Sequence, residues 1–528
     1  MTTPLAPHES GRPQLLKALA GLGQVDLAVI GGGATGLGVA LDAAQRGLSV
    51  VLLESHDFAK GTSSRATKLV HGGVRYLAQG NIALVREALH ERATLLHNAP
   101  HLASPLPFVV PGYKCWEMPF YGVGLKVYDA LSGKAGLGST EFLDTRQTLQ
   151  CMPGVRAQGL KGGVKYWDGQ FDDARLALAL ARTAAAQGAL LLNYCPVTDL
   201  IHEQGKVAGL RCIDAESGQP YTVRARCVIN ATGVWVDQIR QKDGEAIGRT
   251  VQPMVAPSQG VHLVVDSEFF PGEHALLVPK TQDGRVLFAV PWLGKVILGT
   301  TDTPRHDLAR EPDAFAQEVD FILGEAGRYL KRAPTRADVK SIWVGLRPLV
   351  RPPENEGDNT KKISREHTVL VSPAGLVTVT GGKWTTYRAM AEDTLQKCVD
   401  SALLKPLPPS RTGSLKLVGA ALGRKTITQP PGLLAYGSEA AIVQSLPGAD
   451  TELAPGISVA MLRFAARYEY ARTVEDMLAR RVRLLFLDAK LAAQLAATVA
   501  DILQEETGAD PHLDEFLALA AQYQRVPA

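Results

Sequence analysis

Residues 61–77, GTSSRATKLVHGGVRYL, concentrate the groups that proteins use to bind anions. The stretch contains three glycines, three fixed cations, one histidine and no acidic residue. Arginine and lysine beside glycines, whose backbone N–H groups are accessible, favour a phosphate or carboxylate ligand. A solvated basic loop has the same composition, so the surrounding elements must decide between the two interpretations.

A glycine motif precedes this stretch. Residues 25–30, VDLAVI, form a short apolar run that is typical of a buried parallel strand. Gly31, Gly33 and Gly36 follow in a G-x-G-x-x-G pattern at the start of a helical segment. A second apolar run ends at Glu54, 18 residues after Gly36. The order of strand, glycines, helix, strand and acid predicts a complete β-α-β unit.

Each part of this unit has a role in binding a dinucleotide. Gly31 permits the tight turn, Gly33 lets the backbone approach a pyrophosphate, and Gly36 lets the helix pack closely on the strand. The positive end of the helix attracts the negative ligand, and Glu54 can accept hydrogen bonds from ribose hydroxyls. An ordinary tight turn between strand and helix is the alternative interpretation.

Two further strand–glycine–helix junctions favour FAD over NAD. Residues 227–237 are an apolar strand that breaks into Ala231, Thr232 and Gly233. Residues 375–395 are another strand, then Gly381 and Gly382, then a helix with Thr385 near its start. Three such junctions can surround one large, extended cofactor, and the N–H groups that follow Gly382 can face the carbonyl edge of a flavin.

The composition sets outer limits. With 528 residues, two or three domains are expected, and a net charge of +3 excludes a general nucleic-acid binder. Six scattered cysteines fit reduced thiols in the cytoplasm. The N-terminus lacks the pattern of a signal peptide, and no apolar run is long enough to cross a bilayer. No metal site is predicted.

The order of these motifs resembles the FAD-dependent glycerol-3-phosphate dehydrogenases, with the glycerol-phosphate oxidases close behind. The stretches that carry the resemblance are DLAVIGGGATGLGVALDAAQRGLSVVLLE, GTSSRATKLVHGGVRYL, FDDARLALA, VINATGVWVD, VPWLGKVILGTTDT, GLRPLV, GGKWTTYR and ARYEYARTVEDMLARRVRLLFLDA. The resemblance implies oxidation of sn-glycerol 3-phosphate to dihydroxyacetone phosphate by hydride transfer to FAD, with a quinone as the final acceptor. Three alternatives stay open: an oxidase that forms hydrogen peroxide from oxygen, an amine or amino-acid oxidase, and a non-catalytic flavin sensor.

The resemblance also assigns roles within the opening stretch and beyond it. Along the FAD it places the hydroxyl residues and glycines Thr62, Ser63, Ser64, Gly72 and Gly73. Around the substrate phosphate it places Arg75, Tyr76, Arg347 and Lys383, and Lys383 also counts among the cofactor residues with Gly382 and Thr385. Plain packing is the alternative for Tyr76, and a surface position before a proline turn is the alternative for Arg347.

Two histidines are candidates for the catalytic base. A group with a pKa of ~6.5 can take the C2 hydroxyl proton as the hydride leaves C2. His71 lies in the opening stretch, and His262 lies in SQGVHLVV. A satisfied structural histidine is the alternative at either position. Lys383 or Arg347 can instead stabilise charge on the reacting oxygen.

We expect an α/β fold with a Rossmann-like FAD domain, an inserted antiparallel-sheet substrate domain and a C-terminal α-helical domain. The predicted bounds are residues 1–24 for an N-terminal tail, about 25–110, 150–250 and 340–405 for the discontinuous FAD domain, about 106–150 and 251–340 for the insert, and 416–528 for the helical domain. Within the insert, the runs at 258–266, 274–279, 285–292 and 295–302 predict an antiparallel meander.

The last domain is rich in arginine at positions 463, 467, 472, 480, 481 and 483. A basic helical surface favours contact with anionic lipid, and pairing inside the protein with Glu469, Glu475 and Asp476 is the alternative. The resemblance implies a peripheral protein on the inner face of the cytoplasmic membrane, possibly a homodimer. The carboxyl group of Asp172 or Asp173 is expected to cap a helix.

Overall fold

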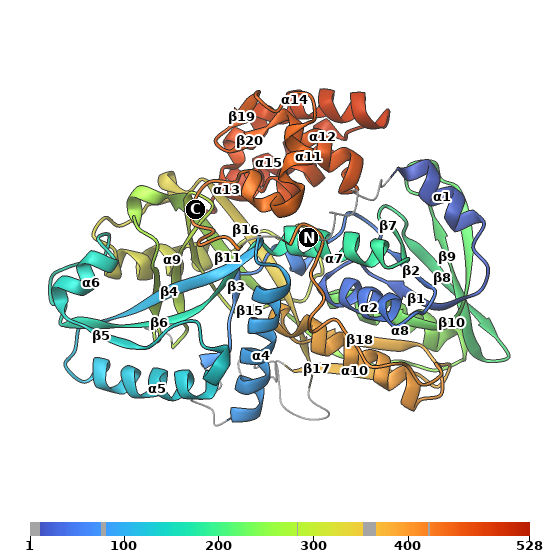
Figure 1. Cartoon of the computed structure of the whole chain (residues 1–528), viewed down its shortest axis with the longest axis horizontal. Helices are drawn as coiled ribbons and strands as arrows, with labels where there is room; N and C mark the ends of the chain where they lie inside the picture. The colour runs from blue at the N-terminus through green and yellow to red at the C-terminus, as the bar shows by residue number, and fades with distance from the viewer. Residues whose placement is uncertain (1–10, 75–80, 282–283, 352–365, 421–422) are drawn as a thin grey trace.

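The chain folds into two large β-sheets that meet side by side, with a group of helices above their junction (Figure 1). We describe a computed structural model over residues 11–74, 81–281, 284–351, 366–420 and 423–528. In the view of Figure 1 the first sheet lies on the right, the second on the left, and the C-terminal helices at the top. The predicted α/β class with a helical C-terminal region is confirmed.

The first sheet has the order β17-β18-β10-β1-β2-β7, with β9 on β10 and β8 on β9. The strands from β18 to β7 run parallel, and all four residues of β2 are buried. Such strands read as continuous apolar runs because helices cover both faces. The strands are β1 (Val25–Ile30), β2 (Val50–Leu53), β7 (Leu190–Leu192), β8 (Val197–Glu203), β9 (Lys206–Ile213), β10 (Pro220–Asn230), β17 (His367–Val371) and β18 (Val377–Gly381).

Helix α2 (Ala34–Gln45) is the central helix of this domain and contacts both α7 (Asp173–Ala186) and α10 (Tyr387–Asp400). Asp172 caps α7, because its side chain accepts a hydrogen bond from the N–H of Arg175. The capping interpretation of the Asp172–Asp173 pair is therefore confirmed for Asp172.

The segment expected to be an N-terminal tail contains a docked helix, α1 (Arg12–Ala20). Arg12 is buried, and its guanidinium donates to Asp214 at 3.0 Å and to the backbone oxygen of Asn193 at 3.0 Å. The sequence shows only a weak amphipathic pattern here, and the anchoring ion pair spans about 200 residues of sequence, so local reasoning missed it.

The second sheet has the order β15-β11-β14-β13-β12-β4-β6-β3, with β16 on β11 and β5 on β6. Strands β12, β13 and β14 form the predicted meander, while β11 lies beyond β14 rather than beside β12. The strands are β3 (Leu69–Val70), β4 (Ala103–Gly112), β5 (Glu141–Leu143), β6 (Gly162–Phe171), β11 (Val255–Asp266), β12 (Ala275–Val278), β13 (Leu287–Trp292), β14 (Lys295–Gly299), β15 (Thr303–Pro304) and β16 (Ser341–Val350).

Several strands of this sheet come from segments that the sequence assigned to the FAD domain, namely β3, β6 and β16. Residue patterns reveal that a strand exists but not which strand it pairs with. The consequence matters for the site, because β16 carries Arg347 and β3 continues the opening stretch into the second sheet. Helices α4 (Ile82–Asn98), α5 (Glu117–Ser132), α6 (Thr145–Cys151), α8 (Val236–Ala246) and α9 (Ala316–Tyr329) complete the two domains.

The C-terminal region consists of α11 (Ala440–Gln444), α12 (Val459–Tyr468), a π-helix (Asp476–Arg481), α13 (Leu484–Leu487), α14 (Ala489–Thr507) and α15 (Leu513–Gln524), with the short strands β19 (Glu452–Ala454) and β20 (Ile457–Ser458). The helical pattern across residues 459–486 is interrupted at Tyr470 and Arg483, which both have left-handed backbone conformations. At Arg483 this conformation accompanies bonds from the guanidinium to the backbone oxygen of Ser64 and to Asp173.

Among the described residues, these six arginines pair with carboxylates of the same chain. Arg480 and Arg481 are buried and both pair with Asp57, while Arg480 also pairs with Glu475 and Asp476. The others pair with carboxylates too: Arg463 and Arg467 with Glu506, Arg472 with Glu216, and Arg483 with Asp173. Burial contradicts the lipid-facing interpretation for Arg480, Arg481 and Arg483, and for the other three the internal pairs support the alternative of pairing inside the protein.

Candidate functional site

The glycine motif forms a tight turn between β1 and α2. Gly31 has a φ of +107°, and a Cβ there would lie 2.7 Å from the backbone oxygen of Ala231. A Cβ on Gly36 would lie 1.9 Å from the backbone oxygen of Gly31, so only glycine lets α2 approach β1 this closely. Gly33 occupies the N-cap position and has no side chain of its own to cap the helix. This geometry agrees with the three roles that the sequence predicts.

Glu54 lies at the end of β2, beside the turn. Its Oε2 accepts from the N–H of Gly32 at 2.6 Å, and its Oε1 accepts from the N–H of His56 at 2.9 Å and the hydroxyl of Ser55 at 3.0 Å. These bonds fix the carboxylate at the edge of the glycine turn. An acceptor in this position suits the hydroxyls of a ribose.

The residues after Glu54 return to the same turn. Ser63 Oγ accepts from the N–H of Ala34, the first residue of α2, at 2.9 Å. Thr62 donates to the backbone oxygen of Leu346 at 2.5 Å, which ties this loop to β16. Ser64 is buried, and its backbone oxygen accepts from Lys68 and Arg483. Ser63 thus contacts the N-terminus of α2 directly, whereas Ser64 connects the loop to Lys68 and Arg483.

The other two predicted junctions converge on this turn. The N–H of Ala231 donates to the backbone oxygen of Ile30 at 2.9 Å, and the hydroxyl of Thr232 donates to Asn230 at 2.8 Å. Gly233 has a φ of +62°, and its backbone oxygen accepts from the hydroxyl of Thr380 at 3.0 Å. The second junction therefore contacts both the first and the third.

The third junction reaches the opening stretch. Trp384, one residue after Lys383, donates from its indole N–H to the backbone oxygen of Ser63 at 2.8 Å. Gly382 has a φ of +71°, and a Cβ there would lie 2.5 Å from the sulfur of Met390. Thr385 is buried in the first turn that follows. Three chain segments far apart in sequence thus surround one glycine-lined turn, which fits an extended dinucleotide such as FAD.

Gly72 and Gly73 follow β3. A Cβ on Gly72 would lie 2.3 Å from the hydroxyl of Tyr128 and 2.4 Å from Leu89, and Gly73 has a φ of +75°. Both positions therefore require glycine for packing or backbone conformation, whether or not a flavin lies beside them. His71 is half-buried next to them. Arg75 and Tyr76 lie outside the described residues.

His262 on β11 meets the opening stretch. Its Nε2 lies 2.9 Å from the hydroxyl of Thr67, and its ring stacks on Trp343 at a centroid distance of 4.1 Å. Burial, together with the nearby charges of Lys68 and Arg347, lowers the pKa of His262 well below its ordinary value. The imidazole is therefore neutral near pH 7.

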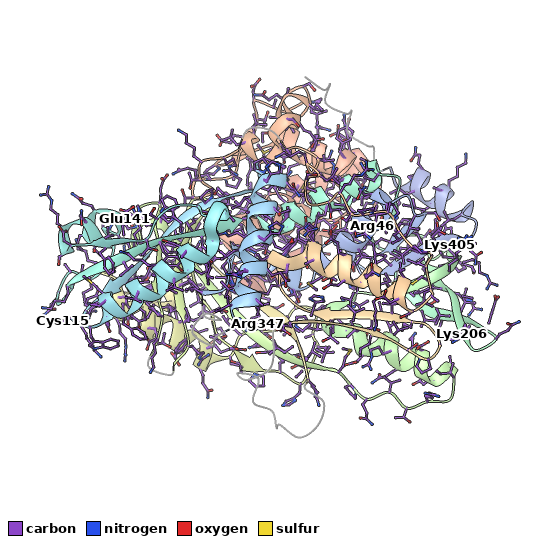
Figure 2. The ribbon with its side chains drawn as sticks, turned by 60° about the horizontal axis from the view of Figure 1, so that its bottom comes forward. Arg46, Cys115, Glu141, Lys206, Arg347 and Lys405 are labelled. Carbon is purple, nitrogen blue, oxygen red and sulfur yellow. The ribbon has the colours of Figure 1, made fainter. Side chains whose placement is uncertain are left out.

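Arg347 on β16 lies near the middle of the molecule, between the end that carries Glu141 and the end that carries Lys206 (Figure 2). Its guanidinium donates to the backbone oxygens of Gln259 at 3.2 Å and Thr301 at 2.9 Å, and lies 3.3 Å from Asp302. The side chain is about one quarter exposed (23%). The guanidinium is therefore held by backbone oxygens and partly exposed, and its role at the substrate phosphate stays a prediction.

Lys68 is a candidate residue that the sequence alone did not single out. It is fully buried, and its ammonium donates to Ser64 O and Asp173 at 2.7 Å each. Burial, only partly offset by Asp173, lowers the pKa of Lys68 to about 7. The visible signal was a lysine directly before the apolar pair Leu69–Val70, but the sequence does not show that the lysine is buried.

The comparisons with known proteins agree with this geometry. Residues 26–392 match the family model described as FAD dependent oxidoreductase, and residues 432–513 match the C-terminal domain of alpha-glycerophosphate oxidase. The mitochondrial glycerol-3-phosphate dehydrogenase of Homo sapiens is 40% identical over 97% of this chain and 74% of its own length. The Schizosaccharomyces pombe protein of the same name is 39% identical over 99% of this chain and 90% of its own length.

Solved structures point the same way. The glycerol-3-phosphate dehydrogenase from Bacillus halodurans, complexed with FAD, has a TM-score of 0.77 and 31% identity, and the match covers 98% of both chains. The chain belongs to the FAD-dependent glycerol-3-phosphate dehydrogenase family. L-alpha-glycerophosphate oxidase from Mycoplasma pneumoniae, at 16% identity and a TM-score of 0.55, shares the fold over 75% of this chain and 99% of its own. This member of the dehydrogenase family is therefore an FAD-dependent oxidoreductase, as the sequence predicts.

The described residues contain neither a membrane-spanning helix nor a cluster of metal ligands. No helix there is long and apolar enough to cross a bilayer. No group of three or more histidine, cysteine, aspartate or glutamate side chains is arranged there to hold a metal ion.

Proposed function

We propose that this enzyme oxidises sn-glycerol 3-phosphate to dihydroxyacetone phosphate. The observation that carries the proposal is His262, a buried neutral histidine on the strand that pairs with the strand of Arg347, in contact with Thr67 of the opening stretch. Its pKa is lowered by burial and by the neighbouring charges of Lys68 and Arg347. A phosphorylated alcohol needs both a cation for its phosphate and a neutral base for its hydroxyl proton.

In this proposal each residue has one task. FAD, when bound, supplies the hydride acceptor. Arg347 binds the substrate phosphate, because its guanidinium is fixed by Gln259 and Thr301 yet remains partly exposed. His262 takes the C2 hydroxyl proton. Burial is the main cause of the lowered pKa of His262, and a bound dianion would offset the smaller part that comes from the charges of Lys68 and Arg347.

The test of the phosphate site is a pair of substitutions at Arg347. Arg347→Gln removes the charge and should lower kcat/KM by about 30- to 1,000-fold, corresponding to ~2–4 kcal/mol, while FAD stays bound. Arg347→Lys keeps the positive charge but lacks the two-pronged hydrogen bonding of a guanidinium, so its kcat/KM should lie between those of wild type and Arg347→Gln. The activity of Arg328→Gln, a variant of a surface arginine, should equal that of wild type. Unchanged kinetics in Arg347→Gln would remove this residue from the substrate site.

We further propose that the electrons pass to a membrane quinone. An oxidase using oxygen is the alternative, and the C-terminal oxidase-type match in residues 432–513 keeps it open. Reoxidation of the substrate-reduced enzyme with a soluble quinone and with oxygen, at equal concentrations, separates the two. A faster quinone reaction supports the dehydrogenase, and rapid peroxide formation supports the oxidase. A homodimer stays a prediction, which analytical ultracentrifugation tests.

A peripheral position on the cytoplasmic membrane is our proposal for the location, and α5 is the surface that supports it. Trp116, Phe120, Val123 and Val127 are 56%, 67%, 64% and 45% exposed. Their spacing of four, three and four residues puts them on one face of the helix, and Phe142 of β5 is also 45% exposed. Lys114 and Lys126 lie over the rings of Trp116 and Phe142. Apolar rings with flanking lysines suit an anionic bilayer surface.

The inner face of α5 points toward the proposed cofactor region. Tyr128 of α5 donates to Asp168 at 3.0 Å, and its hydroxyl limits the space at Gly72. One helix thus joins the apolar face to the glycines expected near the flavin. A quinone that enters from the bilayer at this face would approach the reduced cofactor by a short route.

A double substitution tests this face. Phe120→Ser with Val123→Ser should abolish cosedimentation with vesicles of anionic phospholipid and leave turnover with a soluble quinone unchanged, because both side chains are exposed. Leu434→Ser, at a position that is 69% exposed in the C-terminal region, is the matched control. Equal vesicle binding by the double variant and wild type would refute the assignment of α5.

A further inference from the structure

One loop of the second domain contacts two segments of the proposed FAD site. This cover loop, residues 306–313, follows β15 and precedes α9. Its Leu308 accepts a hydrogen bond from the indole N–H of Trp235 at 3.2 Å, and the backbone oxygen of Arg310 accepts from the guanidinium of Arg65 at 2.8 Å. Trp235 lies just after the Ala231–Gly233 junction, and Arg65 lies in the opening stretch. The cover loop is thus held by two of the segments that form the FAD site.

Arg310 is the residue of the cover loop that lies next to this site. Its guanidinium lies 4.0 Å from the centroid of the Trp235 ring. Glu54, the acid expected to bind the adenosine ribose, acts on it electrostatically, and burial lowers the pKa of Arg310. The pKa of His56 is lowered mainly by burial and, to a smaller extent, by the positive charge of Arg310. The charge of Arg310 therefore interacts with the groups that follow β2.

This guanidinium lacks a carboxylate partner. Among the residues that the structure describes, no carboxylate lies within ion-pair distance of Arg310, and its side chain is half-buried. The neighbouring cations differ: Arg65 pairs with Glu311, and Lys60 pairs with Glu311 and Glu475. A half-buried charge without a partner costs stability unless a ligand compensates for it. The adenosine diphosphate half of FAD carries the matching negative charge.

We infer that Arg310 binds the adenosine diphosphate half of FAD and that the cover loop closes this end of the cofactor site. The inference rests on the FAD site and is independent of which substrate the enzyme oxidises. A guanidinium stacked on an indole is already oriented, so little rotamer freedom is lost when it pairs with a diphosphate.

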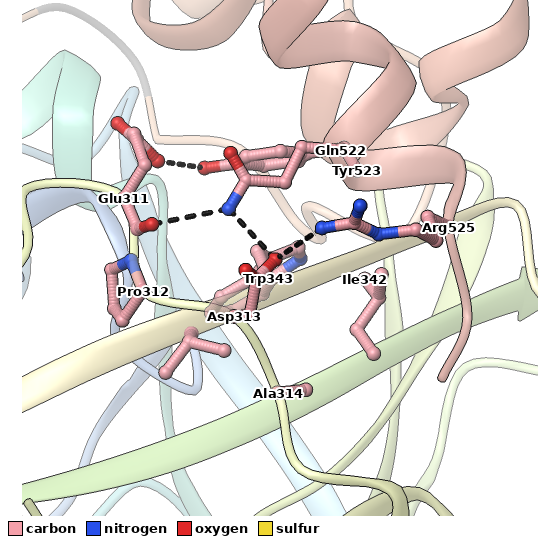
Figure 3. A pocket seen from close by; sticks show the side chains of 10 residues that line it. Glu311, Pro312, Asp313, Ala314, Ile342, Trp343, Gln522, Tyr523 and Arg525 are labelled. Carbon is pink, nitrogen blue, oxygen red and sulfur yellow. Dashed lines mark hydrogen bonds and ion pairs between the residues drawn. The ribbon is translucent and has the colours of Figure 1, made fainter. Parts of the chain in front are cut away.

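The C-terminus braces the cover loop from outside (Figure 3). Gln522 donates to the backbone oxygen of Glu311 at 3.1 Å and to Asp313 at 2.9 Å. Tyr523 donates to the carboxylate of Glu311 at 3.1 Å, and Arg525 pairs with Asp313 at 3.0 Å. The end of α15 therefore determines where the loop sits, and through it the position of the loop's cation.

Titration of the apoprotein with FAD, followed by flavin fluorescence, tests the inference. Arg310→Gln should raise the Kd for FAD about 10- to 100-fold, the range for loss of one charged hydrogen-bonding group. ADP, added as a competitor of FAD binding, should lose affinity by a similar factor. Arg310→Lys should fall between Arg310→Gln and wild type. The control is Arg332→Gln, which changes another arginine that lies over an aromatic ring, 4.2 Å from the centroid of Phe269.

Wild-type affinities for FAD and ADP in Arg310→Gln would overturn the inference. A weaker FAD complex with unchanged ADP affinity would overturn it too, because the effect would then lie at the flavin half. The variant should fold, since the guanidinium makes no side-chain ion pair among the described residues; the lysine variant gives a second, more conservative test. For the brace, Gln522→Ala with Arg525→Ala should speed FAD release, and an unchanged release rate would remove α15 from the inference.

Discussion

A substitution at Gly33 distinguishes the role of this residue in protein stability from its role in FAD binding. Its φ of −82° and ψ of −177° are allowed for alanine. A Cβ there would meet only the hydroxyl of Ser63, at 3.1 Å, among the described residues. That hydroxyl can rotate, at the expense of its bond to the N–H of Ala34. We expect Gly33→Ala to destabilise the apoprotein by about 1 kcal/mol, which shifts the Tm of a chain of 528 residues by only ~1 °C.

The cofactor should respond far more strongly to the same change. The added methyl group occupies the space through which a diphosphate reaches the N-terminus of α2. If two charge-assisted hydrogen bonds are lost, the cost is about 3–6 kcal/mol, or roughly 100- to 10,000-fold in the Kd for FAD. Fluorescence titration of the apoprotein with FAD measures this change, and calorimetry of the apoprotein measures the change in stability.

Two matched variants make the comparison decisive. In Gly36→Ala the methyl would lie 1.9 Å from the backbone oxygen of Gly31, about 1.5 Å inside ordinary contact, so α2 must move and the apoprotein should lose ~3 kcal/mol. Gly23→Ala, where a Cβ meets nothing within 4 Å, should change neither quantity. If Gly33→Ala bound FAD like wild type, or destabilised the apoprotein as much as Gly36→Ala, our explanation of Gly33 would be refuted.

Two further predictions concern buried charges. The pKa of Lys68 is lowered to about 7, so at pH 9 Lys68 is uncharged in the folded protein but protonated in the unfolded chain, whose lysines titrate near ~10.4. The free energy of unfolding of wild type, measured relative to Lys68→Met by urea denaturation, should therefore rise by about 2 kcal/mol from pH 7 to pH 9. A constant difference between the two proteins would mean that Lys68 stays charged. Arg481→Met leaves Asp57 with one guanidinium partner fewer and should lower the free energy of unfolding by ~3–5 kcal/mol, measured by thermal unfolding. The surface variant Arg328→Met should lower it by less than ~1 kcal/mol. Equal losses of stability in the two variants would contradict the structural role of the buried pair.

The sequence predicted what depends on local geometry. The β-α-β unit around Gly31, Gly33, Gly36 and Glu54 is set by residues within 30 positions of one another, and glycine spacing reports directly on backbone approach. The meander of β12 to β14 is likewise a matter of neighbouring strands and short turns. The family resemblance added the substrate and the expected cations, which spacing alone did not provide.

The features that the sequence did not predict depend on contacts between distant segments. The lysine at position 68 looks like any other cation of a basic loop until Asp173 and Trp343 close around it. Arg480 and Arg481 look like a lipid-facing cluster because their partner, Asp57, lies more than 400 residues away. Burial and pairing partner are properties of the folded chain, and no local pattern encodes them.

Anaerobic reduction of the flavin tests the central claim most directly. The purified, FAD-loaded protein is mixed with sn-glycerol 3-phosphate in the absence of oxygen, and the oxidised-flavin absorbance near ~450 nm is followed in a stopped-flow instrument. The account predicts rapid bleaching by glycerol 3-phosphate and none by glycerol or amino acids. Bleaching by an amino acid, or none by glycerol 3-phosphate, would contradict it.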